Sequence, residues 1–268
     1  MTEQTYRERA PSVPNVASVW IQTVAPGSEP HRHRTIPHGS VELLCPVGGL
    51  PHVVGPQTAP RLETLAPGAT VVGVRFRLGA APAVLGVPAS ELVDLTVGAE
   101  ELWGPAAVRI GELVASARTP EEAAAALELA AVAHAARIEP DPVVAGAAAL
   151  LLPGRTEDVA SLPSELYVSE RTLRRRVQAA IGLPPKVVHR LLRFQGFLAL
   201  AHGRGGDPAE LARLAAEAGY ADQSHLTREC LRLAGLSPRA LMEESLEHCR
   251  RAGHDHTVSY APLLDGLA

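Results

Sequence analysis

The stretch from Ala215 to Pro238, AAEAGYADQSHLTRECLRLAGLSP, predicts two short helices separated by a tight turn. Gly219 is the residue type that lets a chain leave a helix through a left-handed conformation. Asp222 suits the cap of the following helix, and Leu226 stands where it can pack that helix down. Two short helices joined by a turn of three or four residues form a helix-turn-helix.

A second unit of the same kind lies about 50 residues earlier, which makes a weak internal repeat. Helices are predicted at Thr156–Leu166 and Glu170–Ala180, and Ser169 is a good N-cap for the second of them. Gly182 and Pro184 end this pair. A longer helix, Pro185–His202, is predicted between the two units.

The later unit closely resembles the AraC/XylS signature, in which an alanine, a Gly-Tyr pair, Ser-His-Leu, an arginine and Gly-x-Ser-Pro follow in order. These positions are held by Ala215, Gly219-Tyr220, Ser224-His225-Leu226, Arg228 and Gly235–Pro238. The earlier unit, from Leu162 through Val168–Arg175 to Pro184, is similar to its upstream partner. The resemblance spans about residues 141–245. It implies a rigid linking helix and two recognition helices in successive major grooves on one face of DNA.

Both predicted recognition helices carry side chains that can hydrogen-bond base edges or phosphates. Arginine binds guanine O6 and N7 through two hydrogen bonds, and glutamine binds adenine in the same way. The resemblance maps the family's base-contacting positions onto Arg171 and Arg175 in the first helix. In the second it maps them onto Gln223, Ser224 and Arg228. With the outward-facing neighbours included, the candidate DNA-binding residues are Arg171, Arg174, Arg175, Gln223, Ser224, Thr227 and Arg228.

The arginine run 174–176 has a simpler interpretation, because such runs are usually solvated faces. The surrounding signature favours DNA contact, and Arg176 is the member expected to face solvent or touch phosphate. A protein-interaction module with a degenerate helix-turn-helix is the alternative, and it should have lost these arginines. The sequence also departs from the family pattern. Pro163 falls inside the first predicted helix, and Val177 and Cys230 stand where phenylalanine is common.

Residues 1–100 are predicted to be rich in β-strands. Apolar runs at Val16–Val24, Val41–Val47, His52–Val54 and Thr70–Leu78 alternate with Pro and Gly turns, as in a sandwich or barrel. Helices are predicted to follow at Ala81–Leu85, Ala106–Ala117 and Pro120–Arg137, the last with Thr119 as N-cap. Arg34–Leu43, Gly73–Arg77 and Leu102–Gly104 are similar to a cupin-like domain found ahead of such DNA-binding units. That resemblance implies a small-molecule sensor.

The predicted fold class is therefore α+β. An N-terminal β-rich, cupin-like or barrel domain precedes a C-terminal all-α domain with two helix-turn-helix units. The prolines at 140 and 142 disfavour helix before them and mark the boundary. We predict a sensor domain at residues 1–138, a DNA-binding domain at 139–252 and a polar tail at 253–268. For His254 and His256 in this tail, disorder is the default expectation.

Three residues are weak candidates for effector binding. Arg75 and Arg77 share one face of a predicted strand, and their forked donors suit an anionic effector. Ion pairs on an exposed sheet face are the alternative. Trp103 is the third candidate, although both Trp20 and Trp103 also fit a core.

The pair His31 and His33, with His38 nearby, raises the question of a metal, because cupins bind metal through His-x-His, a carboxylate and a further histidine. Pro37 and His38 occupy the places where the carboxylate is expected. We therefore predict no metal, and solvated loop histidines instead.

Composition limits the function classes. Residues 1–153 hold 10 basic and 15 acidic residues, whereas residues 154–252 hold 15 basic and 12 acidic, so only the second region has a positive balance suited to nucleic acid. Cys45, Cys230 and Cys249 are far apart and lack metal-ligand spacing, which predicts a reducing compartment. The sequence shows no signal segment and no apolar run of about 18 residues. We expect a cytoplasmic protein with no membrane partner.

An enzyme is the rival class. The sequence lacks a nucleophile motif, a Gly-rich phosphate loop and HExxH. A DNA-repair alkyl acceptor fused to an AraC-type unit would need clustered zinc cysteines, and Cys45 stands alone. We predict a sequence-specific DNA-binding transcription regulator without catalytic activity or cofactor. Its expected partners are double-stranded DNA, a small-molecule effector, RNA polymerase and a second copy of the chain. A domain that only oligomerises is the alternative to the sensor.

Overall fold

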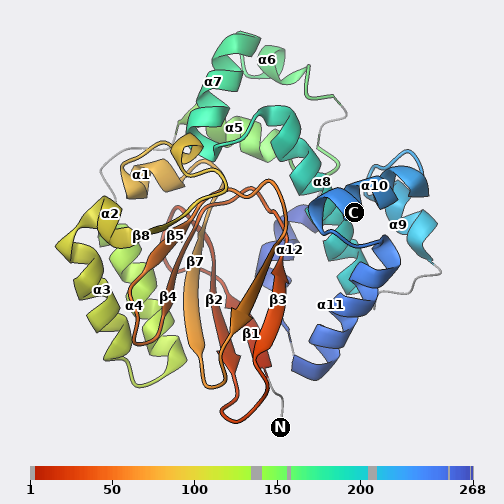
Figure 1. Ribbon diagram of the computed structural model, residues 1–268. Coiled ribbons are helices and arrows are strands. Elements are labelled where there is room, and N and C mark those ends of the chain that lie inside the picture. The colour runs from red at the N-terminus through yellow and green to blue at the C-terminus, as the bar shows by residue number, and fades with distance from the viewer. Residues whose placement is uncertain are drawn as a thin grey trace.

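The N-terminal half is built on a six-stranded antiparallel sheet with strand order β1-β2-β7-β4-β5-β8 (Figure 1). In the described part of the chain, β3 and β6 form a second, separate sheet of two antiparallel strands. The strands are β1 Gln4–Arg9, β2 Val16–Val24, β3 His31–Thr35, β4 Glu42–Pro46, β5 His52–Val54, β6 Arg61–Leu65, β7 Thr70–Phe76 and β8 Thr96–Gly98.

Helices follow and surround this sheet in the computed structural model. Those of the N-terminal half are α1 Ala81–Leu85, the short 3₁₀ helix η1 Ala89–Glu91, α2 Ala99–Trp103, α3 Pro105–Ala115 and α4 Pro120–Ala133. Those of the C-terminal half are α5 Pro142–Leu150, α6 Leu162–Glu165, α7 Glu170–Ile181, α8 Pro185–Gly203, α9 Leu211–Glu217, α10 Gln223–Leu233, α11 Pro238–Ala252 and α12 Thr257–Leu264. The structure describes residues 4–133, 141–155, 158–204, 210–252, 254–265 and 267, and for 246–252 it describes the backbone alone.

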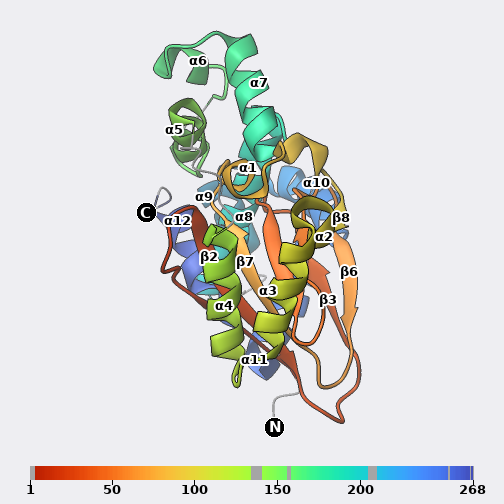
Figure 2. The same cartoon turned by 90° about the vertical axis from the view of Figure 1, so that its left-hand side faces the viewer.

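The period of two along each strand divides the sheet into an apolar face and a mixed face. Leu43 and Cys45 on β4, like Val72 and Val74 on β7, point into a core closed by α3 and α4. Figure 2 shows these two helices in front of the sheet. On the other face of the sheet, Glu42 of β4, Arg75 of β7 and Trp20 of β2 line a cavity.

The C-terminal helices form a second core, whose largest fully buried side chains include Phe194 and Phe197 of α8. Helix α12 packs against α8 and also against β1 and β2, so it joins the two halves (Figure 1). The backbone N–H of Asp255 donates to the Tyr6 carbonyl at 3.0 Å, and Arg34 on β3 forms an ion pair with Glu244 on α11 at 3.0 Å.

The α+β fold class is confirmed, with a β-rich first half and a helical second half that contains both helix-turn-helix units. The four predicted strand segments match β2, β4, β5 and β7, and the Thr119 cap is present because its hydroxyl accepts from the Glu122 N–H at 3.1 Å. Strands β1, β3, β6 and β8 were not predicted, because they are short or polar and two of them form only a partly exposed pair. The predicted domain boundary, between residues 138 and 139, and the side chain of Cys249 lie outside the described residues.

The expectation of disorder for the C-terminal tail is wrong. Thr257–Leu264 forms α12, and Leu263 is buried. Tyr6 of β1 stacks on His256, with ring centroids 4.8 Å apart. Composition did not predict this helix, because residues 254–257 are polar and because its partners, α8, β1 and β2, are distant in the sequence.

Candidate functional site

The first helix-turn-helix unit consists of α6 and α7. The Ser169 hydroxyl accepts from the Thr172 N–H at 3.2 Å and so caps the start of α7, as predicted. Leu173, Val177 and Ile181 form the buried face of this helix. Arg171, Arg174 and Arg175 are exposed on its other side, at the i, i+3 and i+4 spacing that places them on one face.

Arg176 differs from its neighbours in the arginine run. Its guanidinium lies 3.3 Å from the Asp141 carboxylate, and its side chain is only partly exposed. The same carboxylate caps α5 by accepting from the Val143 N–H. The structure therefore separates Arg176, which ties α7 to α5, from the three arginines that face outward. Arg176 was expected to face solvent or to touch phosphate; it is partly exposed and is also paired with Asp141.

The second unit consists of α9 and α10. Gly219 adopts a left-handed conformation with φ of 77°, and the Asp222 carboxylate accepts from the His225 N–H at 2.7 Å. Both features match the prediction. Leu226, Cys230 and Leu233 lie on the buried face of α10.

The predicted contact residues of α10 lie on its outer side. Gln223, Ser224 and Arg228 are exposed, whereas Thr227 is half-buried and its hydroxyl donates to the Gln223 carbonyl at 2.9 Å. Arg232 is exposed one turn beyond Arg228 and was not predicted. The i, i+4 spacing of these two arginines was the signal that could have found it.

Helix α8 connects the two units and is anchored to the second. It has 19 residues, which corresponds to about 28 Å of helix. The Arg193 guanidinium lies 4.6 Å from the centroid of the Tyr220 ring, and Arg190 lies 3.5 Å from the Glu229 carboxylate. These contacts fix α9 and α10 to the linker, as a rigid linking helix requires.

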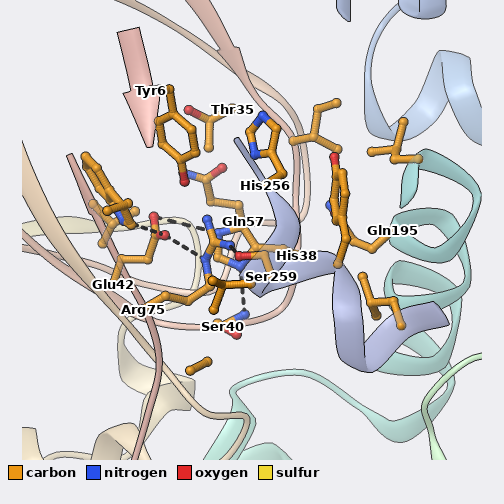
Figure 3. Close-up of a pocket in the computed structure, with 18 of the residues that line it drawn as sticks. Tyr6, Thr35, His38, Ser40, Glu42, Gln57, Arg75, Gln195, His256 and Ser259 are labelled. Carbon is orange, nitrogen blue, oxygen red and sulfur yellow. Dashed lines mark hydrogen bonds and ion pairs between the residues drawn. The ribbon is translucent and has the colours of Figure 1, made fainter. Parts of the chain in front are cut away.

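A cavity of about 740 Å³ lies between the sheet and the C-terminal helices (Figure 3). Its walls come from both sheets and from α5, α8, α11 and α12. Aliphatic side chains such as Leu44, Val71, Leu198 and Leu263 make up much of the lining. The volume falls within the range of about 300–1,000 Å³ that is typical of small-molecule sites.

Arg75 is the centre of a buried polar cluster on the cavity wall (Figure 3). Its guanidinium lies 2.9 Å from Glu42 and 3.4 Å from Glu8, and it also donates to the Ser259 hydroxyl on α12. Burial alone would raise the pKa of Glu42, but Arg75 and then His38 outweigh burial and lower that pKa to about 2. The cluster joins β1, β4, β7 and α12 and holds two carboxylates against one guanidinium.

Profiles of two known domain families match the sequence. A domain of unknown function (DUF6597) matches residues 10–98, and a helix-turn-helix domain matches residues 162–244, the segment that contains α6 to α10. Residues 162–244 form a helix-turn-helix domain of the AraC type.

Further comparisons cover nearly the whole chain. A structure of ToxT from Vibrio cholerae is 10% identical, with a TM-score of 0.43, and the match covers 89% of this chain and 98% of that chain. Unsaturated fatty acid bound wild-type ToxT is 10% identical, with a TM-score of 0.45 and coverage of 86% and 96%. The comparison with curated proteins found no match.

The AraC-type domain accommodates its departures from the family pattern. Pro163 lies in the first turn of the short helix α6, where proline costs no hydrogen bond, so it does not interrupt the helix. Val177 and Cys230 are fully buried in the core of the domain. Burial raises the pKa of the Cys230 thiol to about 12, so it packs as a small apolar group.

The candidate effector residues occupy three different settings. Arg75 forms the ion pairs that the alternative expected, but its side chain is only 18% exposed, so the exposed setting is wrong. Arg77 is an exposed residue that lines the cavity, and its Nε–H donates to the Val16 carbonyl at 3.1 Å. Trp103 packs against the core near α3 and is not among the described residues that line the cavity, whereas Trp20 does line it.

The histidines of the N-terminal half lie on a strand and beside carboxylates. His31 and His33 are on β3, so they are not loop residues as expected. His33 lies 3.6 Å from Glu63, and His38 lies 3.7 Å from Glu42. Within the described ranges, no group of three or more His, Cys, Asp or Glu side chains is arranged to hold a metal ion.

Among the described residues, none forms a helix both long and apolar enough to cross a membrane.

Proposed function

We propose that this chain is a sequence-specific DNA-binding transcription regulator whose affinity for DNA responds to a small organic molecule bound in the cavity. The observation that carries the DNA-binding part is the outward face of the AraC-type domain. It presents Arg171, Arg174 and Arg175 from α7 and Gln223, Ser224 and Arg228 from α10. A domain of this type favours a regulator over an enzyme.

The position of the cavity supports the effector part of the proposal. The sheet provides one wall, whereas α8, which links the two helix-turn-helix units, provides part of the other. A ligand between them would contact both halves. It can therefore favour one arrangement of the halves, and differential binding to two arrangements typically changes DNA affinity by a coupling of about 1–3 kcal/mol.

Binding-site selection with the full-length protein tests the DNA-binding proposal. Arg175→Ala and Arg228→Ala should each relax the preference at one base position, at a cost of about 1–3 kcal/mol for the selected site. Arg176→Ala is the matched control, because Arg176 is on the same helix but is paired with Asp141. Binding should weaken steeply with salt through counterion release.

Two results would contradict the DNA-binding proposal. One is the absence of any selected sequence from a random library. The other is an unchanged base profile in both arginine variants, since that would assign these side chains to phosphates or to solvent. Because the recognition helices are expected in adjacent grooves, the contacted half-sites should be about one helical turn apart.

Self-association is a second proposal, and exposed leucines support it. Leu113 on α3 and Leu129 on α4 are 51% and 62% exposed, although leucine is usually buried. A homodimer would cover such side chains. Sedimentation of Leu129→Glu against the unsubstituted protein tests this, and equal masses for the two would contradict it. Contact with RNA polymerase stays a prediction.

A further inference from the structure

Gln57 is a buried polar residue of the cavity wall. It is 5% exposed and lies in the loop between β5 and β6 (Figure 3). Among the residues that the structure describes, neither Nε2 nor Oε1 of its carboxamide has a partner. Its loop is tightly held, because a Cβ added to Gly55 would lie 1.7 Å from the Leu92 carbonyl oxygen. The Asp94 N–H also donates to the Pro56 carbonyl at 3.0 Å.

No described protein group satisfies this carboxamide, so its hydrogen bonds are left to whatever fills the cavity. A buried donor or acceptor without a partner costs about 1–3 kcal/mol. The carboxamide presents a donor beside an acceptor, so a group with an acceptor beside a donor satisfies both at once. Amides and lactams have this pattern in neutral form.

The charges around Arg75 disfavour an anionic group at that part of the cavity wall. Among the described ion pairs, the buried carboxylates of Glu8 and Glu42 face a single guanidinium, that of Arg75, whose side chain is 18% exposed. Glu63 also lines the cavity, and burial and then Glu42 raise the pKa of its carboxyl. Arg34 is already paired through two nitrogens with Glu244, at 3.0 and 3.4 Å. A carboxylate placed beside Arg75 would meet the carboxylates of Glu8 and Glu42 against one guanidinium. The exposed Arg77 is the cavity arginine with no carboxylate partner among the described ion pairs, so the balance is negative only around Arg75.

We infer that the effector is a neutral carboxamide or lactam with an apolar body, and that Gln57 binds its amide group. This inference rests on the proposed effector function of the cavity. The aliphatic lining from the sheet and from α8 and α12 takes the body. Gln57 supplies both hydrogen bonds to the polar end, and binding removes the cost of its unpaired amide.

The Gln57 loop also touches the first recognition helix. A Cβ added to Gly182, the C-cap of α7, would lie 2.8 Å from Pro56 Cγ and 2.9 Å from the Ala89 carbonyl oxygen of η1. Ser90 of η1 borders the outward face of α7 beside Arg174 and Arg175. A ligand that draws Gln57 into the cavity therefore acts on a loop in direct contact with α7.

Hexanamide and octanamide are the probes, and hexanoate and octanoate at pH 8 are the charged probes of equal length. Binding to the full-length protein is measured by titration calorimetry and by the emission of Trp20, which lines the cavity. The amides should bind more tightly than the carboxylates. Gln57→Leu should weaken amide binding about tenfold, the effect of one lost hydrogen-bonded group. Gln178→Leu, a glutamine on α7 away from the cavity, is the control and should leave binding unchanged.

The thermal midpoint of ligand-free Gln57→Leu gives a second readout. It should stay equal or rise, because the substitution removes an unpaired buried amide. A lowered midpoint would show that the carboxamide has a structural partner and would overturn the inference. Tighter binding of the carboxylates, equal amide binding by Gln57→Leu, or no binding of either amide would also overturn it. DNA binding by the same preparations reports separately on the proposed regulator function.

Discussion

Arg75→Met is the substitution that most directly tests how the two halves are held together. It removes the only guanidinium that contacts Glu8 and Glu42 among the ion pairs of the described residues, while keeping an unbranched apolar stem. The Glu8 side chain is 0% exposed and that of Glu42 is 9% exposed. Removing one partner of a buried ion pair costs about 3–5 kcal/mol, because the remaining charge stays buried. For a chain of this size the thermal midpoint should fall by roughly 10 °C.

Thermal and urea unfolding of the full-length protein measure this loss. Arg7→Met is the matched control. The Arg7–Glu121 pair on the surface is 57% and 55% exposed, so its loss should cost less than about 1 kcal/mol. Adding Glu42→Gln to Arg75→Met should recover part of the stability, because it removes one of the two uncompensated carboxylates.

The stability difference between the unsubstituted protein and Arg75→Met should depend on pH in a defined direction. In the unsubstituted protein the pKa of Glu42 is about 2, so its contribution to stability is full above pH 4.5 and is lost as pH falls toward 2. Without Arg75, burial holds this pKa above 4.5, so the folded variant gains stability as Glu42 takes up a proton. The difference between the two proteins should narrow between pH 7 and 5. A loss no larger than that of Arg7→Met, or a difference independent of pH, would refute the reasoning.

Three further predictions concern stability. Burial, followed by His202 and Arg75, lowers the pKa of His256 to about 3, so stability should fall by about 1 kcal/mol per pH unit as pH drops from 6.5 toward 3. His256→Phe should remove this slope in urea unfolding, and an unchanged slope would contradict the assignment. Tyr167 is 95% exposed with φ of 54°, so Tyr167→Gly should stabilise the protein by about 1 kcal/mol. Tyr167→Ala, which keeps a Cβ, should not, and equal thermal midpoints for the two variants would refute the strain. A Cβ at Gly73 would lie 2.1 Å from the Trp20 ring, so Gly73→Ala should cost about 2 kcal/mol and change Trp20 emission. Unchanged emission would count against this packing.

The sequence alone determined the DNA-binding half, because local interactions specify it. Gly219 enters the turn in the left-handed conformation and Asp222 caps α10, and each needs only neighbours along the chain. Ser169 caps α7 in the same way. Periodicity then separated buried Leu173 and Leu226 from the exposed arginines.

The strongly apolar strands were predictable for a related reason. Strand β2 is buried on both faces, between α4 and the cavity, and therefore stands out as an apolar run. Strands β3 and β6 depend on pairing with each other although β4 and β5 lie between them in the sequence, and the polar residues of β3 carry no apolar signal. Pattern alone cannot supply such a partner.

Only the tertiary structure decided what the polar side chains of the N-terminal half do. Arg75 was expected to bind an anion or to form ion pairs on an exposed face, and the structure gives its partners, Glu8 and Glu42 from other strands, in a mostly buried setting. Gln57 carried no sequence signal, and its unpaired amide exists only because the fold buries its loop. Residues 253–268 were predicted to be a polar tail, but in the structure they contain α12, which packs against β1 and α8. Burial and pairing between residues distant in sequence are set by packing, and composition does not record them.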